Sequence, residues 1–534
     1  MKQATVEVDG GQEPASSSSA VQGLKIYPPK ESSYDDYEGI GEKPSRFEVW
    51  GWYLYEFCSY FVQTVIIPVL FPLIISQLQQ LHIDPVQEWH INHPGMTCGE
   101  KQIQLHSTLT KRTISVSGSH FSSLEWTSIG WATGLVLAIP SLTFISFHLD
   151  GILQNLITAA ATGVGAFFCL PAGFFKTTKI FIPYIAAIVL ASTVATASHT
   201  RHLGLMIRAQ LSGPINRTQF IKRQGVSSKH SLHATAAGTL GAAIVSSFIY
   251  HMLREPPDRD FISLWIVSIF SGLIWLVGVL HAVTSPNRGS PVFNSVSSTF
   301  HPCSVFKHPH AVGGLIGVFI SSFATMCIFT GGVLFVVGPL CVKSVHLLFF
   351  WLVYFLFPLF SMPLLQPFQQ LIKADSVKMN LMGFLLSLLS SGFGFYFWNS
   401  HWKWGHIMMF GAIQSTGTGL LHAFGRVLVL ECAPHGKEGA FSVWYAWMRA
   451  AGLCVGFTVA AVVPGHIRTS FGAAFCAAIV GCVVLLFGNV SGVEGAVAAG
   501  HVMGDNERGT NGLGLDSKES VSVCLKDETL ELNK

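Results

Sequence analysis

Four ionisable residues lie inside or at the ends of long apolar stretches of this 534-residue chain, and they are its first candidates for chemistry. Glu56 stands in WGWYLYEFCSYFVQTVIIPVLFPLIISQ, Arg426 and Glu431 close a later apolar run, and Arg449 stands in the run after that. A charged side chain within a membrane span is costly unless it is paired, so such residues commonly mark functional sites. A carboxylate beside arginines could form ion pairs that break and re-form, and a desolvated carboxylate could bind a proton reversibly.

The positions of these residues along their runs give them a common depth. At 1.5 Å per residue, Glu56 lies roughly 9 Å from the start of its run, and Arg449 lies roughly 14 Å from the start of its own run. We expect Glu56, Arg426, Glu431 and Arg449 to form a cluster in one half of the membrane, as a gate or a site of proton coupling. The alternative is a permanent latch that only holds helices and loops together.

Uncharged polar residues within the apolar runs are candidates for contact with a substrate. The run AIQSTGTGLLHAFGR is unusually polar for a membrane span. Small and hydroxyl residues in membrane helices mainly allow close helix packing. We therefore expect only the amides Gln63 and Gln414 to face a small-molecule substrate in a cavity.

The sequence carries no signature of an enzyme, a metal site or a cofactor site. GxSxG, GxxxxGK and HExxH are absent, so we expect no catalytic residue. Five histidines between residues 78 and 125 lack the spacing of zinc ligands. The 11 cysteines form no CxxC pair, and most stand in apolar runs, where we expect small core residues. A net charge of +3 without a basic block excludes nucleic acid as a partner.

The composition is that of a membrane protein with many spans. The chain is 50% hydrophobic and only 11% charged, whereas soluble domains carry about 25% charged residues. A membrane span needs about 20 mostly apolar residues. Runs of this kind occur at 50–77, 126–148, 153–172, 179–198, 233–253, 261–283, 309–341, 346–368, 379–399, 404–430, 440–464 and 469–489.

Basic residues favour one orientation of these twelve runs. With the N-terminus in the cytosol, cytosolic segments hold 20 of the 32 Lys and Arg residues and the opposite segments hold 10. We predict a disordered cytosolic tail at 1–45, a six-helix half at 46–283 with a luminal loop at 78–125, a central cytosolic loop at 284–308, a second half at 309–490, and a disordered cytosolic tail at 491–534.

Two segments of the predicted cytosolic side carry signals of their own. The stretch 199–232 mixes apolar and basic residues, which favours either an interfacial helix on anionic membrane lipid or a plain basic connector. The residues Tyr37 to Ile40 fit the tyrosine-plus-apolar pattern that endolysosomal sorting adaptors read. A sorting adaptor is therefore a candidate partner.

Two stretches resemble the vacuolar effluxers of the major facilitator superfamily, typified by the autophagy-related amino-acid exporter of the yeast vacuole. GWYLYEFCSYFVQTVIIPVLFPL is similar to that family's opening helix, with Gly51, Tyr53 and Tyr55 before Glu56, where the family commonly has an aspartate. GRVLVLECAPHGKEGAFSVWYAWMRAAG is similar to a second family stretch. The residues that match there are Arg426, Glu431, Pro434, Gly436, Lys437, Glu438, Phe441 and Tyr445. The superfamily's acidic-basic loop motif survives only as Asp150-Gly151, without its arginines.

The resemblance implies an all-α fold of twelve transmembrane helices in two six-helix halves, of the major-facilitator type. It also implies a vacuolar or lysosomal membrane and release of neutral amino acids or similar small solutes to the cytosol by alternating access. Two other interpretations stay open: a non-transporting receptor or scaffold with this fold, and a transporter of sugars or metal complexes.

Overall fold

Long helices make up most of the part of the chain that the structure describes. The structure, a computed structural model, describes residues 43–79, 89, 98–151, 153–174, 176–210, 217–254, 260–286, 302–397, 402–464 and 466–502. These residues belong to one compact unit of the chain, residues 40–534. The predicted sorting pattern Tyr37 to Ile40 lies outside the described residues.

The first half of the chain forms six spans and a small polar subdomain. The first span is α1 (Arg46–Phe61), continued by η2 (Val62–Leu70) and α2 (Phe71–Gln77); the others are α5 (Ser123–Leu149), α6 (Gln154–Cys169), α7 (Phe181–Gln210), α8 (Arg217–Arg254), and α9 (Asp260–Val277) with the short α10 (Leu280–Thr284). Single turns η3 (Pro171–Gly173) and η4 (Thr178–Ile180) join α6 to α7. The subdomain between the first two spans comprises α4 (Glu100–Thr110) and the antiparallel strands β1 (Ile114–Val116) and β2 (Ser119–Phe121).

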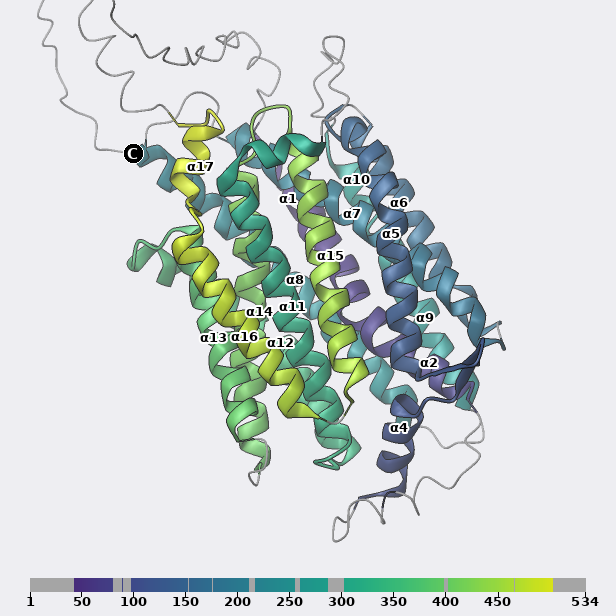
Figure 1. The fold of residues 1–534 in the computed structure, drawn as a ribbon. Coiled ribbons are helices and arrows are strands. Elements are labelled where there is room, and N and C mark those ends of the chain that lie inside the picture. The colour runs from purple at the N-terminus through teal and green to yellow at the C-terminus, as the bar shows by residue number, and fades with distance from the viewer. Residues whose placement is uncertain are drawn as a thin grey trace, which may run out of the picture. The chain divides into compact units, whose positions relative to one another are not determined.

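The second half also forms six long helices. After the turn η6 (Pro302–Lys307) these are α11 (Pro309–Val337), α12 (Ser344–Leu371), α13 (Ser376–Tyr396), α14 (Trp404–Glu431), α15 (Glu438–Val462) and α16 (Ile467–Phe487), followed by the short α17 (Gly492–Ala498). Figure 1 shows the long helices side by side, with α4 at one end of the bundle and α17 at the other. The two halves meet where α5 and α7 pack on α15, and α8 packs on α12 and α14.

Twelve spans were predicted, and the described residues contain a long helix for each. Eleven are long and apolar enough to cross a membrane by length and composition. The twelfth, α14, has 28 residues but carries the polar run around Gln414, which lowers its hydropathy. Within the most apolar 18-residue window of each helix, 83% of the residues of the first span are buried, but only 28% of those of α16. The first span therefore lies among the other helices, while α16 presents much of its surface to lipid.

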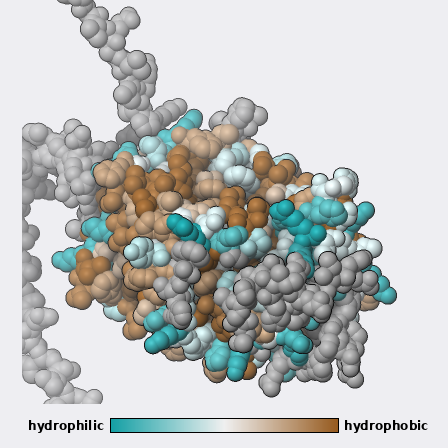
Figure 2. Space-filling view, turned by 60° about the horizontal axis from the view of Figure 1, so that its bottom comes forward, coloured by the Kyte–Doolittle hydropathy of each residue, from teal (hydrophilic) through white to brown (hydrophobic). Residues whose placement is uncertain are grey.

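The outer surface matches this arrangement. Large apolar side chains are exposed along the flanks of the bundle, among them Phe144, Phe360 and Phe487. Figure 2 shows a mainly apolar flank, with hydrophilic residues gathered toward the end that carries α4. A large exposed apolar surface of this kind marks a site of contact with a membrane or a protein, and on a bundle of apolar helices it fits contact with lipid.

Three segments differ from the predictions. The stretch 199–232, for which an interfacial helix and a plain basic connector were both open, mostly continues two long helices, because α7 runs to Gln210 and α8 begins at Arg217. The polar stretch 78–125 contains α4 and the hairpin rather than only loop. The predicted tail at 491–534 begins with α17, and Ala496 of this helix and Val502 beyond it pack with Phe220. In each case apolar contacts with distant parts of the chain order a segment whose local composition is polar.

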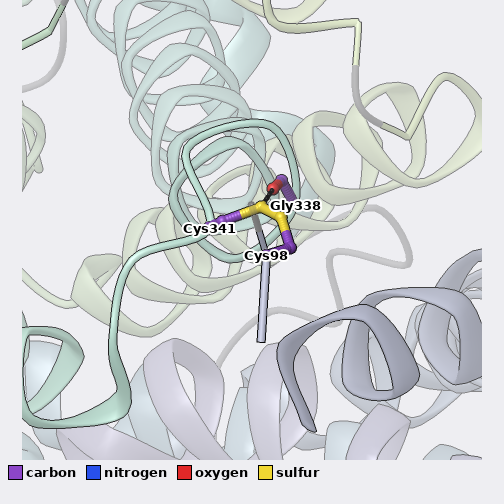
Figure 3. The surroundings of a disulfide bond; sticks show 3 residues. All are labelled: Cys98, Gly338 and Cys341. Carbon is purple, nitrogen blue, oxygen red and sulfur yellow. Dashed lines mark hydrogen bonds between the residues drawn. A yellow bond between two sulfur atoms is a disulfide. The ribbon is translucent and has the colours of Figure 1, made fainter. Parts of the chain in front are cut away.

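A disulfide joins the two halves at the end of the bundle that carries α4. Cys98, just before α4, bonds to Cys341, which lies 243 residues later in the turn after α11 (Figure 3). The amide of Cys341 donates to the Gly338 carbonyl at 3.0 Å and closes that turn. Cys341, which ends the predicted apolar run 309–341, is therefore not the small core residue that we expected. We call this end the disulfide face, and the opposite end, where α1 begins, the N-terminal face.

Close approach of α1 and α8 depends on Gly241. A Cβ at this position would lie 2.1 Å from the Phe57 carbonyl oxygen, which is backbone and cannot rotate away. We expect Gly241→Ala to destabilise the protein by about 1–3 kcal/mol, because the two helices must separate. Gly225→Ala, in the same helix, meets no atom within 4 Å and should leave the thermal unfolding temperature unchanged or higher. Equal unfolding temperatures for the two variants would contradict the expectation.

Candidate functional site

Helix α1 carries Glu56 into a space enclosed by α7, α8, α14 and α15. Gly238 on α8 permits this placement, since a Cβ there would lie 2.8 Å from the Tyr60 Cβ and 3.1 Å from the Glu56 Cγ. Glu56 is only 5% exposed. Its neighbours come from both halves of the chain, so the carboxylate lies where the halves meet.

Three basic side chains surround the Glu56 carboxylate. Arg426 donates from Nη1 to Oε2 at 3.1 Å. His199 Nε2 lies 2.8 Å from Oε2, and His422 Nε2 lies 2.8 Å from Oε1. Arg426 and His422 belong to α14 in the second half, whereas Glu56 and His199 belong to the first. The shared depth predicted the contact between Glu56 and Arg426, and the structure brings them together.

Arg426 is fixed by contacts on its other sides. It is 1% exposed, its Nε donates to Ser231 Oγ at 3.2 Å, and its guanidinium lies 5.0 Å from the centre of the Trp52 ring. A cation over an indole face is attracted electrostatically. The arginine is thus held by α1 and α8 of the other half, and the ion pair is part of the contact between halves.

Arg449 faces the same space but binds a different partner. Its Nη1 donates to Gln63 Oε1, and Gln63 Nε2 donates to Ser192 Oγ at 3.3 Å. The guanidinium also lies 5.9 Å from the centre of the Tyr60 ring. The predicted substrate residue Gln63 is therefore engaged by an arginine of the opposite half in this conformation.

Two small cavities lie between the halves at this depth. One, of about 20 Å³, is lined by Glu56, Gln63, His199, His422 and Arg449 among others. The next, of about 30 Å³, is lined by hydroxyl-bearing residues of both halves together with apolar ones. Its hydroxyl-bearing residues are Tyr60, Thr64, Thr239, Thr325, Tyr354, Ser415 and Thr418. Polar groups converging on an internal space between two domains are typical of a binding site.

Gln414 lies in a separate place. It lines a cavity of about 70 Å³ within the second half, together with mainly apolar and aromatic residues. Ser390 donates to its Oε1, and its Nε2 donates to Thr418 at 3.3 Å. Gln63 and Gln414 therefore do not share a cavity in this conformation.

Glu431 is not part of the cluster that we expected. It accepts hydrogen bonds from Gln224 Nε2 at 3.2 Å and Ser376 Oγ at 3.3 Å. It stands five residues after Arg426, which turns it by about 140° around α14 and moves it about 7.5 Å toward the N-terminal face. Depth alone had grouped the two residues, but helix rotation separates them.

The N-terminal face is closed by contacts between the halves. Arg208 on α7 forms an ion pair with Glu438 at the start of α15. Asp150, at the end of α5, binds Arg201 Nε at 3.1 Å and accepts from the Gly439 amide at 2.8 Å. Arg201 on α7 thus supplies the basic partner of Asp150 that its own loop lacks.

The end of the described chain adds to this face. His501 donates from Nε2 to the Ala433 carbonyl at 2.7 Å. Burial, with Arg208 and Arg223 nearby, holds the pKa of His501 well below its ordinary value. The ring is therefore neutral at pH 7 and adds no charge beside the arginines.

The other motif residues of the second stretch shape the turn between α14 and α15. Gly436 has φ +73°, a left-handed conformation that favours glycine. The Lys437 amide donates to the Pro434 carbonyl at 3.2 Å, and the Lys437 side chain is exposed. Phe441 is buried in the core beneath, and Tyr445 OH lies 3.4 Å from His422 Nδ1.

The motif residues of the opening helix contact the helices around α1, and one of them contacts a residue of the site. Tyr53 OH lies 2.7 Å from His230 Nδ1, and the buried Tyr55 ring lies 4.5 Å from the His199 ring. At Gly51 a Cβ would lie 2.1 Å from Thr284 Oγ1, so glycine lets α10 pack on α1.

Sequence reasoning missed the histidines of the site. His199 and His202 lay in the stretch 199–232, which was predicted to be an interfacial helix or a basic connector. His281 and His422 lay in apolar runs and were not counted as ionisable. A histidine within a membrane span is as unusual as a carboxylate there. That signal was available for His281 and His422.

Comparison with known proteins establishes the fold. No family model matches this chain, and no curated protein sequence matches it. Solved structures do match. The human organic anion transporter MFSD10 (TETRAN) is 13% identical, with a TM-score of 0.50 over 83% of this chain and 100% of its own. The chain has a major-facilitator fold. This confirms the predicted all-α membrane architecture.

A second solved structure gives the same result. A bacterial homologue of the iron transporter ferroportin, in an outward-facing state, is 11% identical. Its TM-score is 0.51 over 83% of this chain and 99% of its own. At these identities the likeness shows the major-facilitator fold, in a protein that crosses the membrane many times.

Proposed function

We propose that this protein is a secondary active transporter that moves a small solute across the membrane by alternating access. The observation that carries the proposal is the buried contact of Glu56 with Arg426 and His422 between the halves. A buried ion pair adds little to stability compared with apolar packing. Such a pair at a domain interface suits a contact that forms in one state and breaks in another.

The orientation proposed from the sequence receives support from the disulfide. Cys98 and Cys341 lie at the face predicted to be luminal, and disulfides form in oxidising compartments rather than in the cytosol. The N-terminal face is then cytosolic. Its contacts, Arg208 with Glu438 and Asp150 with Gly439, close the cytosolic side in this conformation.

The charges of the cavity suit a zwitterion. Glu56 and Arg449 line the same cavity, so a neutral amino acid could place its ammonium group near the first and its carboxylate near the second. Together with the family resemblance, this supports export of neutral amino acids from a vacuole or lysosome to the cytosol. Gln63 would release Arg449 when the substrate carboxylate arrives.

The test is flux of labelled leucine from proteoliposomes that hold the purified protein. We expect saturable flux that an acidic interior accelerates, and we expect Glu56→Gln to remove most of that acceleration, about tenfold or more, because an amide cannot bind and release the proton. Glu494→Gln, an exposed residue at the start of α17, is the matched control and should behave as wild type. Absence of saturable flux for leucine and the other neutral amino acids would refute the proposed substrate class.

A further inference from the structure

Four buried titratable residues lie between Glu56 and the N-terminal face. We propose that His199, His281, His202 and Glu48 form a path that carries the proton of Glu56 to the cytosolic side. The inference rests on the proposed function and deepens it, since it names the coupling ion and its route. The five residues come from α1, α7 and α10.

At each end of this path a histidine nitrogen lies close to a carboxylate oxygen. At the inner end, His199 Nε2 lies 2.8 Å from Glu56 Oε2. At the outer end, His202 Nε2 lies 3.0 Å from Glu48 Oε1. Glu48 is in the first turn of α1, where its amide donates to Ser45 Oγ at 3.1 Å. A proton that reaches Glu48 is therefore one helical turn from the end of the span.

His281 bridges the two pairs. Its ring centre lies 5.5 Å from that of His199 and 5.0 Å from that of His202, both in edge-to-face contact. His199 and His202 are on one face of α7, about one turn apart, and α10 places His281 against both. Glycine at position 51 permits this, because a Cβ there would meet Thr284 Oγ1 at 2.1 Å and the His281 Cα at 3.7 Å.

The second nitrogen of His199 is free to pass a proton onward. His199 is 2% exposed, and its Nδ1 has no hydrogen-bond partner among the described residues. Buried polar atoms without a partner are rare and costly, and they call for a functional explanation. A ring whose Nε2 lies 2.8 Å from Glu56 Oε2 and whose Nδ1 is open can accept a proton on one nitrogen and release one from the other.

The steps balance without any redox change. Protonated Glu56 gives its proton to His199 Nε2, and His199 gives a proton from Nδ1 to His281, directly or through one water. His281 passes a proton to His202, and His202 passes one to Glu48, which releases it to the cytosol. One proton enters and one leaves, and each imidazole returns to its neutral state.

Other charged groups near the path favour movement toward the cytosol. Arg426, His422, Arg449 and Tyr445 line the cavity beside Glu56, so the arginines repel a proton that would return there. Around the histidines, the Tyr55 ring centre lies 5.5 Å from that of His281. The charge of Arg201 is balanced by its ion pair with Asp150. Among the described residues no group of His, Cys, Asp and Glu has the arrangement of a metal site, which favours proton transfer over cation binding.

The first experiment separates coupling from transport. We expect His281→Asn to keep exchange of labelled leucine for unlabelled leucine near the wild-type rate, because exchange needs no proton to leave. Net efflux driven by an acidic interior should fall about tenfold, because each cycle of net efflux must release a proton to the cytosolic side. His148→Asn, at the end of α5 with its ring bonded to the Phe144 carbonyl, should leave both rates unchanged. If His281→Asn keeps the wild-type rate of coupled efflux, the proposed path is wrong. If the variant loses exchange together with coupled efflux, His281 has a purely structural role, and the path is also wrong.

The second experiment needs no substrate. Trp52 stacks on His199 with ring centres 4.6 Å apart, so protonation of His199 should quench the fluorescence of Trp52, identified by its loss in Trp52→Phe. After an acid step on the cytosolic side of proteoliposomes, we expect fast quenching in wild type and quenching at least tenfold slower in His281→Asn and His202→Gln. Equal quenching rates refute the path even if the protein moves no leucine, whereas slower quenching without leucine flux supports the path and refutes only the proposed substrate.

Discussion

Arg426→Ala is expected to lower the free energy of unfolding by about 3–5 kcal/mol, the cost of leaving a buried charge without its partner. Glu56 is 5% exposed and Arg426 is 1% exposed, so water cannot replace the lost guanidinium. The variant also loses the contacts of Arg426 with Ser231 and Trp52, which hold α14 against the first half. Unfolding in mixed micelles measures the stability, and leucine flux should fall at least tenfold.

The double variant shows whether the charge is the cause. Arg426→Ala combined with Glu56→Gln should recover at least half of the lost stability, because it leaves no unpaired carboxylate. Arg468→Ala is the matched control: Arg468 is exposed above the Phe395 ring at 5.6 Å, and its loss should change stability by about 0.5 kcal/mol or less. If Arg426→Ala costs no more than Arg468→Ala, the ion pair does not hold the halves together.

The sequence predicted two kinds of feature: the helices, whose apolar runs are set by the thickness of the bilayer, and the ion pair, which is required by the energetic cost of a charge in lipid. Twelve apolar runs predicted twelve spans because a bilayer sets the length of each helix. Glu56 and Arg426 could be paired from sequence because a charge in lipid must find an opposite charge, and only a few candidates existed at that depth. Glu431 escaped this reasoning because depth says nothing about which side of a helix a residue faces.

The residues that sequence reasoning missed depend on contacts between distant segments. Cys98 and Cys341 meet across 243 residues, and no local pattern connects them. His199 and His202 lie beyond the apolar run of α7, in residues that are buried because α1, α10 and α14 cover them. The helix continues there through tertiary packing, which overrides local composition.

Asp150→Ala is expected to open the N-terminal face. Asp150 binds Arg201, which is 2% exposed, and accepts from the Gly439 amide near the start of α15. A carboxylate at a helix N-terminus is favourable, and a Cβ at Gly439 would lie 2.8 Å from Asp150 Oδ2, so the fit is close. The alanine variant should lose about 3–5 kcal/mol of stability.

The loss should concentrate where the halves meet. Hydrogen exchange in the peptide that spans residues 434–446 should become roughly tenfold faster in Asp150→Ala, because the start of α15 is released from α5. Asp375→Ala is the control at the same face: its carboxylate accepts from the Lys378 amide at 2.8 Å and caps α13, so its loss should cost about 1 kcal/mol and leave that peptide unchanged. Equal exchange in the two variants would mean that α5 and α15 are held by apolar packing, and that Asp150 only balances the charge of Arg201.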